Sequence, residues 1–170
     1  MRDDQHNRPI LFVDVDGVIS LFGFDRLDDP PGSFHMVEGI PHCIGRSAAE
    51  RLARLTGQFE LVWATGWEER ANEHLVHLLE MEGELPVLSF DGRAAFGSAH
   101  WKLEAIDEFA GERPAAWIDD NLDDECRAWA ERRDAPTLLV QTEAAVGIDE
   151  EHVELLLDWA AAVARQAPTS

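Results

Sequence analysis

Short runs of apolar residues alternate along the chain with segments in which apolar residues recur every three or four positions. Unbroken apolar runs predict strands buried on both faces, and the second pattern predicts amphipathic helices. Strands are expected at 9–15, 59–65, 86–90, 115–118 and 137–141, and helices at 47–56, 68–82, 98–110, 123–133 and 150–166. This alternation predicts a three-layer α/β fold with a mostly parallel central sheet.

The chain between the first strand and the first helix breaks this alternation. Residues 20–45 are irregular, with an evident turn at 28–32 and apolar and histidine residues around it. The segment is expected to form a short hairpin flap that projects from the sheet, or else a plain surface loop. Residues 1–170 are otherwise expected to form a single domain with flexible tails at 1–8 and 167–170.

Charge limits the partners of the protein. The net charge is −20, which argues against non-specific binding to nucleic acid and against docking on anionic membranes. No apolar run approaches the roughly 18 residues of a transmembrane helix, and residues 1–9 carry no apolar signal core. Two distant cysteines, Cys43 and Cys126, fit a reducing cytoplasm. The oligomeric state stays open.

The first strand runs directly into two carboxylates and a glycine, Asp14, Asp16 and Gly17. Strand side chains alternate between the two faces, so Asp14 and Asp16 are expected on the same side. Two adjacent like charges raise each other's pKa unless a cation lies between them. The motif therefore predicts a Mg²⁺ site at the carboxyl edge of the sheet, although Asp-Gly is also a common turn dipeptide.

Polar residues follow two further strands, and all are expected at this same edge of the sheet. Thr65 ends the strand at 59–65, and Asp119 and Asp120 follow the strand at 115–118. Lys102, the only lysine among fourteen basic residues, lies near a helix start. Each has a structural alternative: helix capping for Thr65 and for the two aspartates, and a solvated helix surface for Lys102.

In this order, the motifs resemble those of the haloacid dehalogenase-like (HAD) phosphohydrolase superfamily, over residues 10 to about 141. Residues 14–18 resemble its first motif, 63–66 its second, Lys102 its third and 117–120 its fourth. The resemblance implies a Rossmann-like fold. It also implies a phosphatase rather than a dehalogenase, because dehalogenase members lack the second aspartate of the first motif, here Asp16.

The resemblance also implies catalytic and metal-binding roles. Asp14 would attack phosphorus and form an aspartyl-phosphate, and Asp16 would protonate the leaving oxygen and later deprotonate the attacking water. The Mg²⁺ ion would be held by Asp14, by the backbone carbonyl of Asp16 and by Asp119 or Asp120.

Phosphoryl contacts are implied in the same way. Thr65 and the amide of Gly66 would hold phosphoryl oxygens, Gly17 is a further expected substrate-binding position, and Lys102 would offer a compact charge to Asp14 and to the phosphoryl group. His35 and His42 in the flap are possible substrate contacts. Trp67 either walls the site or packs the sheet.

No large cap domain interrupts the motifs, so the site is expected to be open, with at most the flap at 20–45 beside it. A partner could then complete it. The expected function is hydrolysis of a phosphomonoester, on a small molecule or a macromolecular end. Residues 63–67 and 71–72 also resemble HAD domains associated with RNA-repair proteins, so one alternative is a nucleotide or nucleic-acid-end phosphatase. A non-catalytic HAD-like binding module is the other.

Overall fold

Four parallel strands form the central sheet of the computed structural model, which describes residues 7–93 and 97–168. The strands are β1 (Ile10–Val13), β5 (Glu60–Trp63), β6 (Ala115–Asp119) and β7 (Thr137–Gln141), in the order β5-β1-β6-β7. β1 lies in the middle and pairs with both β5 and β6. The predicted α/β fold with a parallel sheet is confirmed.

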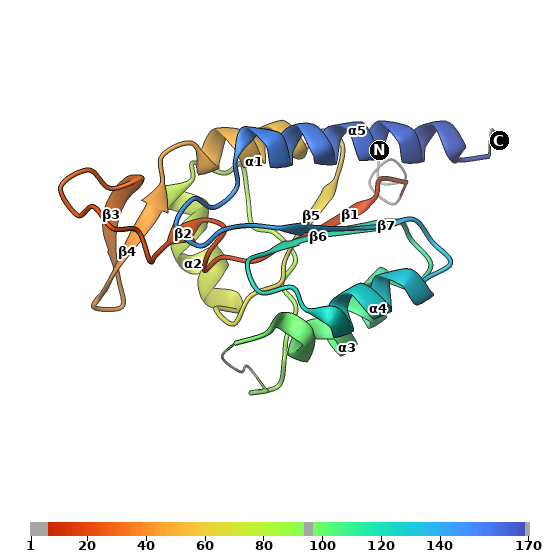
Figure 1. The fold of residues 1–170 in the computed structure, drawn as a ribbon, viewed down its shortest axis with the longest axis horizontal. Helices are drawn as coiled ribbons and strands as arrows, with labels where there is room; N and C mark the ends of the chain where they lie inside the picture. The colour runs from red at the N-terminus through yellow and green to blue at the C-terminus, as the bar shows by residue number, and fades with distance from the viewer. Residues whose placement is uncertain (1–6, 94–96, 169–170) are drawn as a thin grey trace.

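Helices cover both faces of this sheet (Figure 1). Leu11 and Val13 of β1 share one core with α1 (Ala48–Leu55), α2 (Glu69–Leu78) and α5 (Glu150–Gln166). Ile10 and Phe12 point to the opposite face, which η1 (Ala99–Lys102), α3 (Leu103–Ala110) and α4 (Asp124–Arg132) cover. Because strand side chains alternate, a run that is apolar at every position serves two cores.

The largest differences from the predicted elements concern two helices and one strand. The helix expected at 68–82 ends at Leu78, because Glu80 adopts a positive φ of 50° that stops the helix before Gly83. The helix expected at 98–110 begins with the 3₁₀ turn η1. The strand expected at 86–90 is a single parallel bridge between Val87 and Trp63 of β5.

Neither Ser47 nor Ser98 caps the helix that follows it. The Ser47 side chain, just before α1, makes no capping hydrogen bond. The Ser98 hydroxyl, just before η1, donates a hydrogen bond to Asp123 instead. Asp123 is itself the N-cap of α4 and accepts a hydrogen bond from the Cys126 backbone N–H. Ser98 thus ties the start of η1 to the start of α4.

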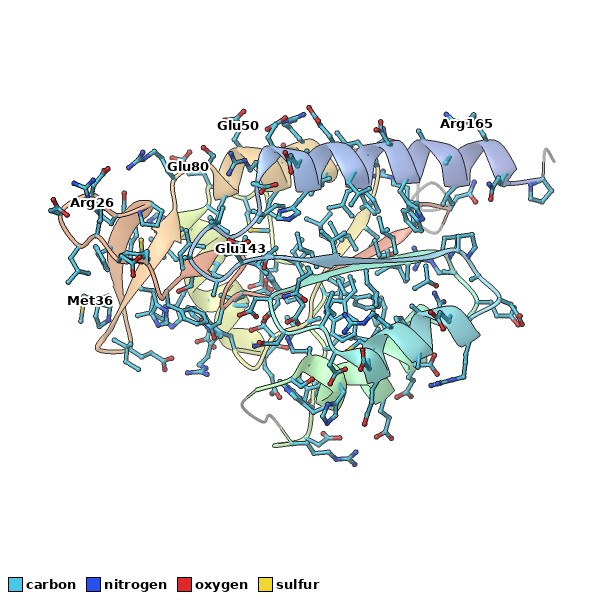
Figure 2. All side chains as sticks on the ribbon, in the orientation of Figure 1. Arg26, Met36, Glu50, Glu80, Glu143 and Arg165 are labelled. Carbon is cyan, nitrogen blue, oxygen red and sulfur yellow. The ribbon has the colours of Figure 1, made fainter. Side chains whose placement is uncertain are left out.

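The segment between β1 and α1 forms a small antiparallel sheet, which we call the flap. It consists of β2 (Ser20–Leu21), β3 (Gly32–Val37) and β4 (Ile40–Gly45), in the order β2-β4-β3. Glu38 and Gly39, with φ of 50° and 80°, make the tight turn between β3 and β4. Figure 2 shows Arg26 and Met36 at its outer end. The predicted hairpin flap is confirmed, and the alternative of a plain loop is wrong.

The base of the flap is fixed by the loop that follows β7. The Thr142 hydroxyl donates to the Gly17 carbonyl at 2.8 Å, and the Ile148 backbone N–H donates to the Val18 carbonyl at 3.0 Å. Gly147 has a φ of 72°, and a side chain there would collide with the carbonyl of Val18. The turn after β1 is therefore fixed by residues 142–148, more than a hundred positions later in the chain.

None of the helices in the described part of the chain is long and apolar enough to cross a membrane. Of the two predicted tails, residues 1–6 and 169–170 lie outside the described residues. The division into a single domain at 1–170 stays a prediction.

We expect Gly147→Ala to lower the free energy of unfolding by about 2 kcal/mol or more, because an added Cβ is strained in the left-handed backbone at this position and collides with the carbonyl of Val18. Gly57→Ala is the matched control, since its added Cβ meets open space at an ordinary φ. Urea unfolding of both variants measures the difference. Equal stability of the two variants would contradict the role of Gly147.

Candidate active site

Three carboxylates meet at the carboxyl edge of the central sheet. Asp14 directly follows β1, Asp119 is the last residue of β6, and Asp120 comes next. Since β1 and β6 are paired neighbours, carboxylate oxygens of all three residues lie within 4.8 Å of one another. Residues more than a hundred positions apart thus converge, as the strand-end pattern predicts.

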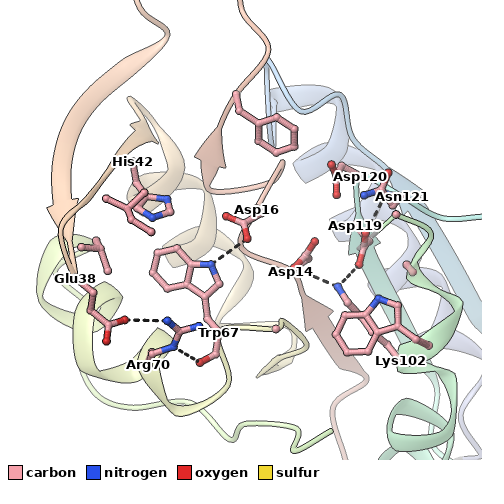
Figure 3. Close-up of a pocket in the computed structure, with 17 residues that line it drawn as sticks. Asp14, Asp16, Glu38, His42, Trp67, Arg70, Lys102, Asp119, Asp120 and Asn121 are labelled. Atoms are coloured by element: carbon pink, nitrogen blue, oxygen red, sulfur yellow. Dashed lines mark hydrogen bonds and ion pairs between the residues drawn. The ribbon is translucent and has the colours of Figure 1, made fainter. Parts of the chain in front are cut away.

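Lys102 lies among these carboxylates (Figure 3). Its Nζ is 2.6 Å from Oδ2 of Asp119 and 3.2 Å from Oδ1 of Asp14, and the residue is 3% exposed. The short 3₁₀ turn η1 brings it to the sheet edge from the side of α3. The alternative of a solvated lysine is wrong. The only lysine of the chain is a buried counter-ion.

Burial controls the protonation of this cluster. It raises the pKa of Asp14 well above its usual range, Lys102 opposes that shift, and Asp119 adds to it. For Lys102, burial acts to lower the pKa, but Asp14 and Asp119 outweigh it and the pKa is raised. Burial and then Asp119 raise the pKa of Asp120 to about 6. The cluster is short of positive charge, as a cation-binding site is expected to be.

The Asp119-Asp120 pair is held by its own loop. The Asn121 backbone N–H donates to Oδ1 of Asp119 at 2.9 Å, and the Gln141 side chain donates to the Asp120 carbonyl. A side chain at Gly17 would overlap the Asp120 carboxylate, so the glycine leaves room for that group rather than lining the cavity. Capping of α4 falls to another residue, Asp123, so capping does not explain Asp119 and Asp120.

Thr65 and Gly66 follow β5 on the other side of β1. Thr65 is buried, and its hydroxyl accepts a hydrogen bond from the Trp67 backbone N–H at 3.2 Å. The alternative of Thr65 as a helix N-cap is wrong, because the N-cap position of α2 is Glu68. Gly66 lines the cavity described below. The structure thus places the second motif beside the first.

Asp16 differs from Asp14 in its surroundings. Its side chain is exposed at the cavity, and its Oδ2 accepts a hydrogen bond from the indole Nε1 of Trp67 at 3.0 Å. Trp67 is 7% exposed and belongs both to the cavity wall and to the core. The two alternatives for Trp67 are therefore both correct.

A cavity of about 680 Å³ opens in front of the carboxylates. One wall comes from the flap and includes Val37, Ile40 and His42. Arg70 of α2 also lines the cavity and pairs with Glu38 at 2.9 Å, which ties the turn of the flap to the body of the protein. The flap thus forms one side of the cavity beside the carboxylates.

The two histidines of the flap differ in position. His42 lines the cavity and packs edge-on against Trp67, with ring centres 4.8 Å apart. His35 pairs with His42 across the strands but is not among the described residues that line the cavity. The His42–Trp67 contact and the Arg70–Glu38 pair are features that sequence analysis missed. The place of His42 in the predicted flap is the signal that could have brought it to the site.

The carboxylates fit a divalent cation. An ion about 2.1 Å from each ligand oxygen holds those oxygens about 3 to 4 Å apart, which the cluster of Asp14, Asp119 and Asp120 can provide. Oxygen-only donors favour a hard cation such as Mg²⁺.

Comparison with known proteins agrees with this geometry. A family described as the HAD domain in Swiss Army Knife RNA repair proteins matches residues 10–153. The chain belongs to this family. No curated protein matches it. A hypothetical protein from Xanthomonas campestris, known from a crystal structure, is similar at 12% sequence identity and a TM-score of 0.48, over 98% of this chain and 92% of that one.

Family membership indicates a hydrolase of the phosphohydrolase type, and HAD proteins generally use a divalent metal ion. All the residues that the four motifs imply lie at one edge of the sheet. Gly17 and Thr65 are buried there and are not among the described residues that line the cavity.

We expect Lys102→Met to lower the free energy of unfolding by about 3 kcal/mol in the presence of a chelator, because two buried carboxylates lose their counter-ion. Arg127→Met is the matched control: it breaks an ion pair with Asp124 whose side chains are 56% and 100% exposed, and should cost less than about 0.5 kcal/mol. Urea unfolding compares them. A loss of equal size in both variants would show that Lys102 is not a counter-ion of the cluster.

Proposed function

We propose that the protein is a Mg²⁺-dependent phosphatase that hydrolyses a phosphomonoester through an aspartyl-phosphate on Asp14. The observation that carries this proposal is the buried Asp14, beside one ammonium group and two further carboxylates, at the floor of a cavity. No structural role accounts for so many buried charges at one strand end.

Asp14 is prepared for attack on phosphorus. Its Oδ1 accepts a hydrogen bond from the Val15 backbone N–H at 2.8 Å and lies 3.2 Å from the Lys102 ammonium. The other oxygen, Oδ2, is then the atom that bonds to phosphorus. Lys102 would reduce the repulsion between the carboxylate and the anionic phosphoryl group. Gly66 lines the cavity, and its amide would hold phosphoryl oxygens.

Mg²⁺ would be held by Asp14, by the backbone carbonyl of Asp16 and by a carboxylate of the fourth motif. Asp119 already accepts hydrogen bonds from Lys102 and from the Asn121 amide, so we favour Asp120 as that ligand. When bound, the ion supplies neutralising charge for the phosphoryl oxygens.

Asp16 would be the general acid and base of the proposed reaction. Both carboxyl groups of the first motif line the cavity, and Asp16 is the exposed one, where a leaving group and then a water molecule would pass. It would give a proton to the leaving oxygen as the phosphorus–oxygen bond breaks. It would take a proton from the water that hydrolyses the aspartyl-phosphate.

We expect hydrolysis of p-nitrophenyl phosphate to require Mg²⁺ and to fall by about 10³-fold or more in Asp14→Asn, which keeps the shape of the side chain and removes the nucleophile. Asp158→Asn, on the exposed surface of α5, is the matched control and should retain full activity. Release of p-nitrophenol, with and without chelator, measures both. Full activity in Asp14→Asn would refute the proposal, and absence of both turnover and Mg²⁺ binding in the folded wild type would favour the binding module.

A second candidate, a nucleotide or nucleic-acid-end phosphatase, is favoured by the aromatic side chains of the cavity. Trp67, Trp101 and His42 line it, and aromatic side chains stack on nucleobases with about 1–3 kcal/mol per base. The family description, which names RNA repair proteins, also supports this candidate. The charge of −20 limits such binding to a phosphorylated end rather than a long strand.

We expect kcat/KM to be about tenfold higher for nucleoside monophosphates, or for 3′- or 5′-phosphorylated oligonucleotides, than for sugar phosphates of equal charge, because only the former can stack. Release of inorganic phosphate across this panel, at constant ionic strength, provides the measurement. Equal values for bases and sugars would exclude this candidate and leave the broader phosphatase intact.

A further inference from the structure

The indole of Trp67 holds the Asp16 carboxyl from one side. Its Nε1–H donates to Oδ2 of Asp16 at 3.0 Å, and the bond links the loop after β5 to the loop after β1 (Figure 3). Trp67 is buried, whereas the Asp16 side chain is exposed. An exposed carboxyl would otherwise turn freely about its side-chain bonds, so this hydrogen bond selects its orientation.

The indole is itself fixed by several elements. The Trp67 backbone N–H donates to the Thr65 hydroxyl at 3.2 Å. The His42 ring packs edge-on against the indole at 4.8 Å, and Nδ1 of His42 is hydrogen-bonded to the Ser20 hydroxyl at 2.8 Å. Strands β2 and β4 of the flap and the loop after β5 therefore fix the donor before any substrate binds. Such support is what precise positioning of a reacting group requires.

The chemistry of indole determines which oxygen of Asp16 carries a proton. An indole N–H donates a hydrogen bond and cannot accept one. Oδ2 is therefore the acceptor in both protonation states. The carbonyl oxygen of a carboxylic acid accepts a hydrogen bond better than its hydroxyl oxygen does, so this contact favours Oδ2 as the carbonyl oxygen and Oδ1 as the oxygen that carries the proton. We propose that Trp67 is a positioning residue that holds Asp16 by Oδ2 and leaves Oδ1 as the atom that transfers protons. This inference rests on the proposed function.

Formation and hydrolysis of the aspartyl-phosphate then use the same oxygen of Asp16, Oδ1. In the first, a bond forms between Asp14 and phosphorus, the bond from phosphorus to the leaving oxygen breaks, and the proton on Oδ1 of Asp16 passes to that oxygen. In the second, the oxygen of water bonds to phosphorus, the bond to Asp14 breaks, and a proton of the water passes to Oδ1. The indole keeps the same hydrogen bond throughout, so Asp16 does not rotate between the halves.

The value of this positioning depends on the leaving group. An aryl oxygen leaves readily as an anion, whereas an alkyl oxygen needs its proton as the bond breaks. A misplaced Asp16 therefore slows the attack on alkyl phosphates and leaves that on aryl phosphates nearly unchanged. The ratio of kcat/KM between the two substrates reports the first half of the reaction and is insensitive to the fraction of enzyme that is folded.

The test is Trp67→Phe, which keeps an aromatic ring and removes the donor, assayed with Mg²⁺ on p-nitrophenyl phosphate and on β-glycerol phosphate. We expect kcat/KM for the alkyl ester to fall by about 10- to 100-fold and that for the aryl ester by less than about threefold. Trp129→Phe is the matched control, since it removes an indole N–H that donates to Asp107 at 2.9 Å, outside the site. It should leave the ratio unchanged.

Trp67→Phe could also change the ratio by altering contacts with the substrate. Introducing Trp67→Phe into the Asp16→Asn variant distinguishes that effect from positioning of Asp16. If Trp67 acts through Asp16, Trp67→Phe does not alter the ratio in that background, and a persistent change would overturn the proposal. If Trp67→Phe fails to fold, His42→Leu is the second variant, because it removes the ring that packs on the indole. We expect His42→Leu to lower the ratio of alkyl to aryl kcat/KM by threefold or more relative to the wild type. An unchanged ratio would overturn the proposal.

Parallel losses on both substrates would also overturn the role of Trp67 while leaving the phosphatase intact. Absence of turnover of either substrate by the wild type would refute the proposed function, and this inference with it.

Discussion

One ammonium group shared by two buried carboxylates holds the site together. Lys102 contacts Asp14 of the loop after β1 and Asp119 of β6, and all three side chains are almost entirely removed from water. The parallel pairing of β1 with β6 fixes the distance between the carboxylates, and η1 brings the ammonium group of Lys102 to the same edge of the sheet. Burial makes the ion pairs strong, and it also makes any one of the charges costly to leave alone.

The two aspartates of the first motif have different environments although they are two residues apart. Asp14 is buried among charges at the floor of the cavity, and Asp16 is exposed to the cavity and held by an indole. In the proposed reaction, this division would give a nucleophile held by fixed partners at the cavity floor and an acid–base group on its exposed side. The flap supports the second environment through His42, and Arg70 fastens the flap to α2 through Glu38. A three-stranded insertion thus helps to shape the environment of Asp16.

Much of this arrangement could be predicted from the sequence, because it depends on strand ends. Apolar runs that serve two cores define β1, β5, β6 and β7, and parallel strands bring Asp14 and Asp119 to one edge. What could not be predicted depends on local backbone choices or on contacts between distant residues. Glu80 ends α2 in a conformation that glutamate seldom adopts, and nothing in a single sequence links Trp67 to Asp16 across fifty-one positions.

The position of Lys102 has a consequence for the reactivity of the whole protein. As the chain has no other lysine, its only side-chain amine is 3% exposed and engaged by two carboxylates. Amine-directed acylating reagents thus meet no accessible side-chain amine while the fold is intact. Acylation of Lys102 would mark the molecules whose sheet edge has opened, so the residue is a built-in chemical reporter of local unfolding.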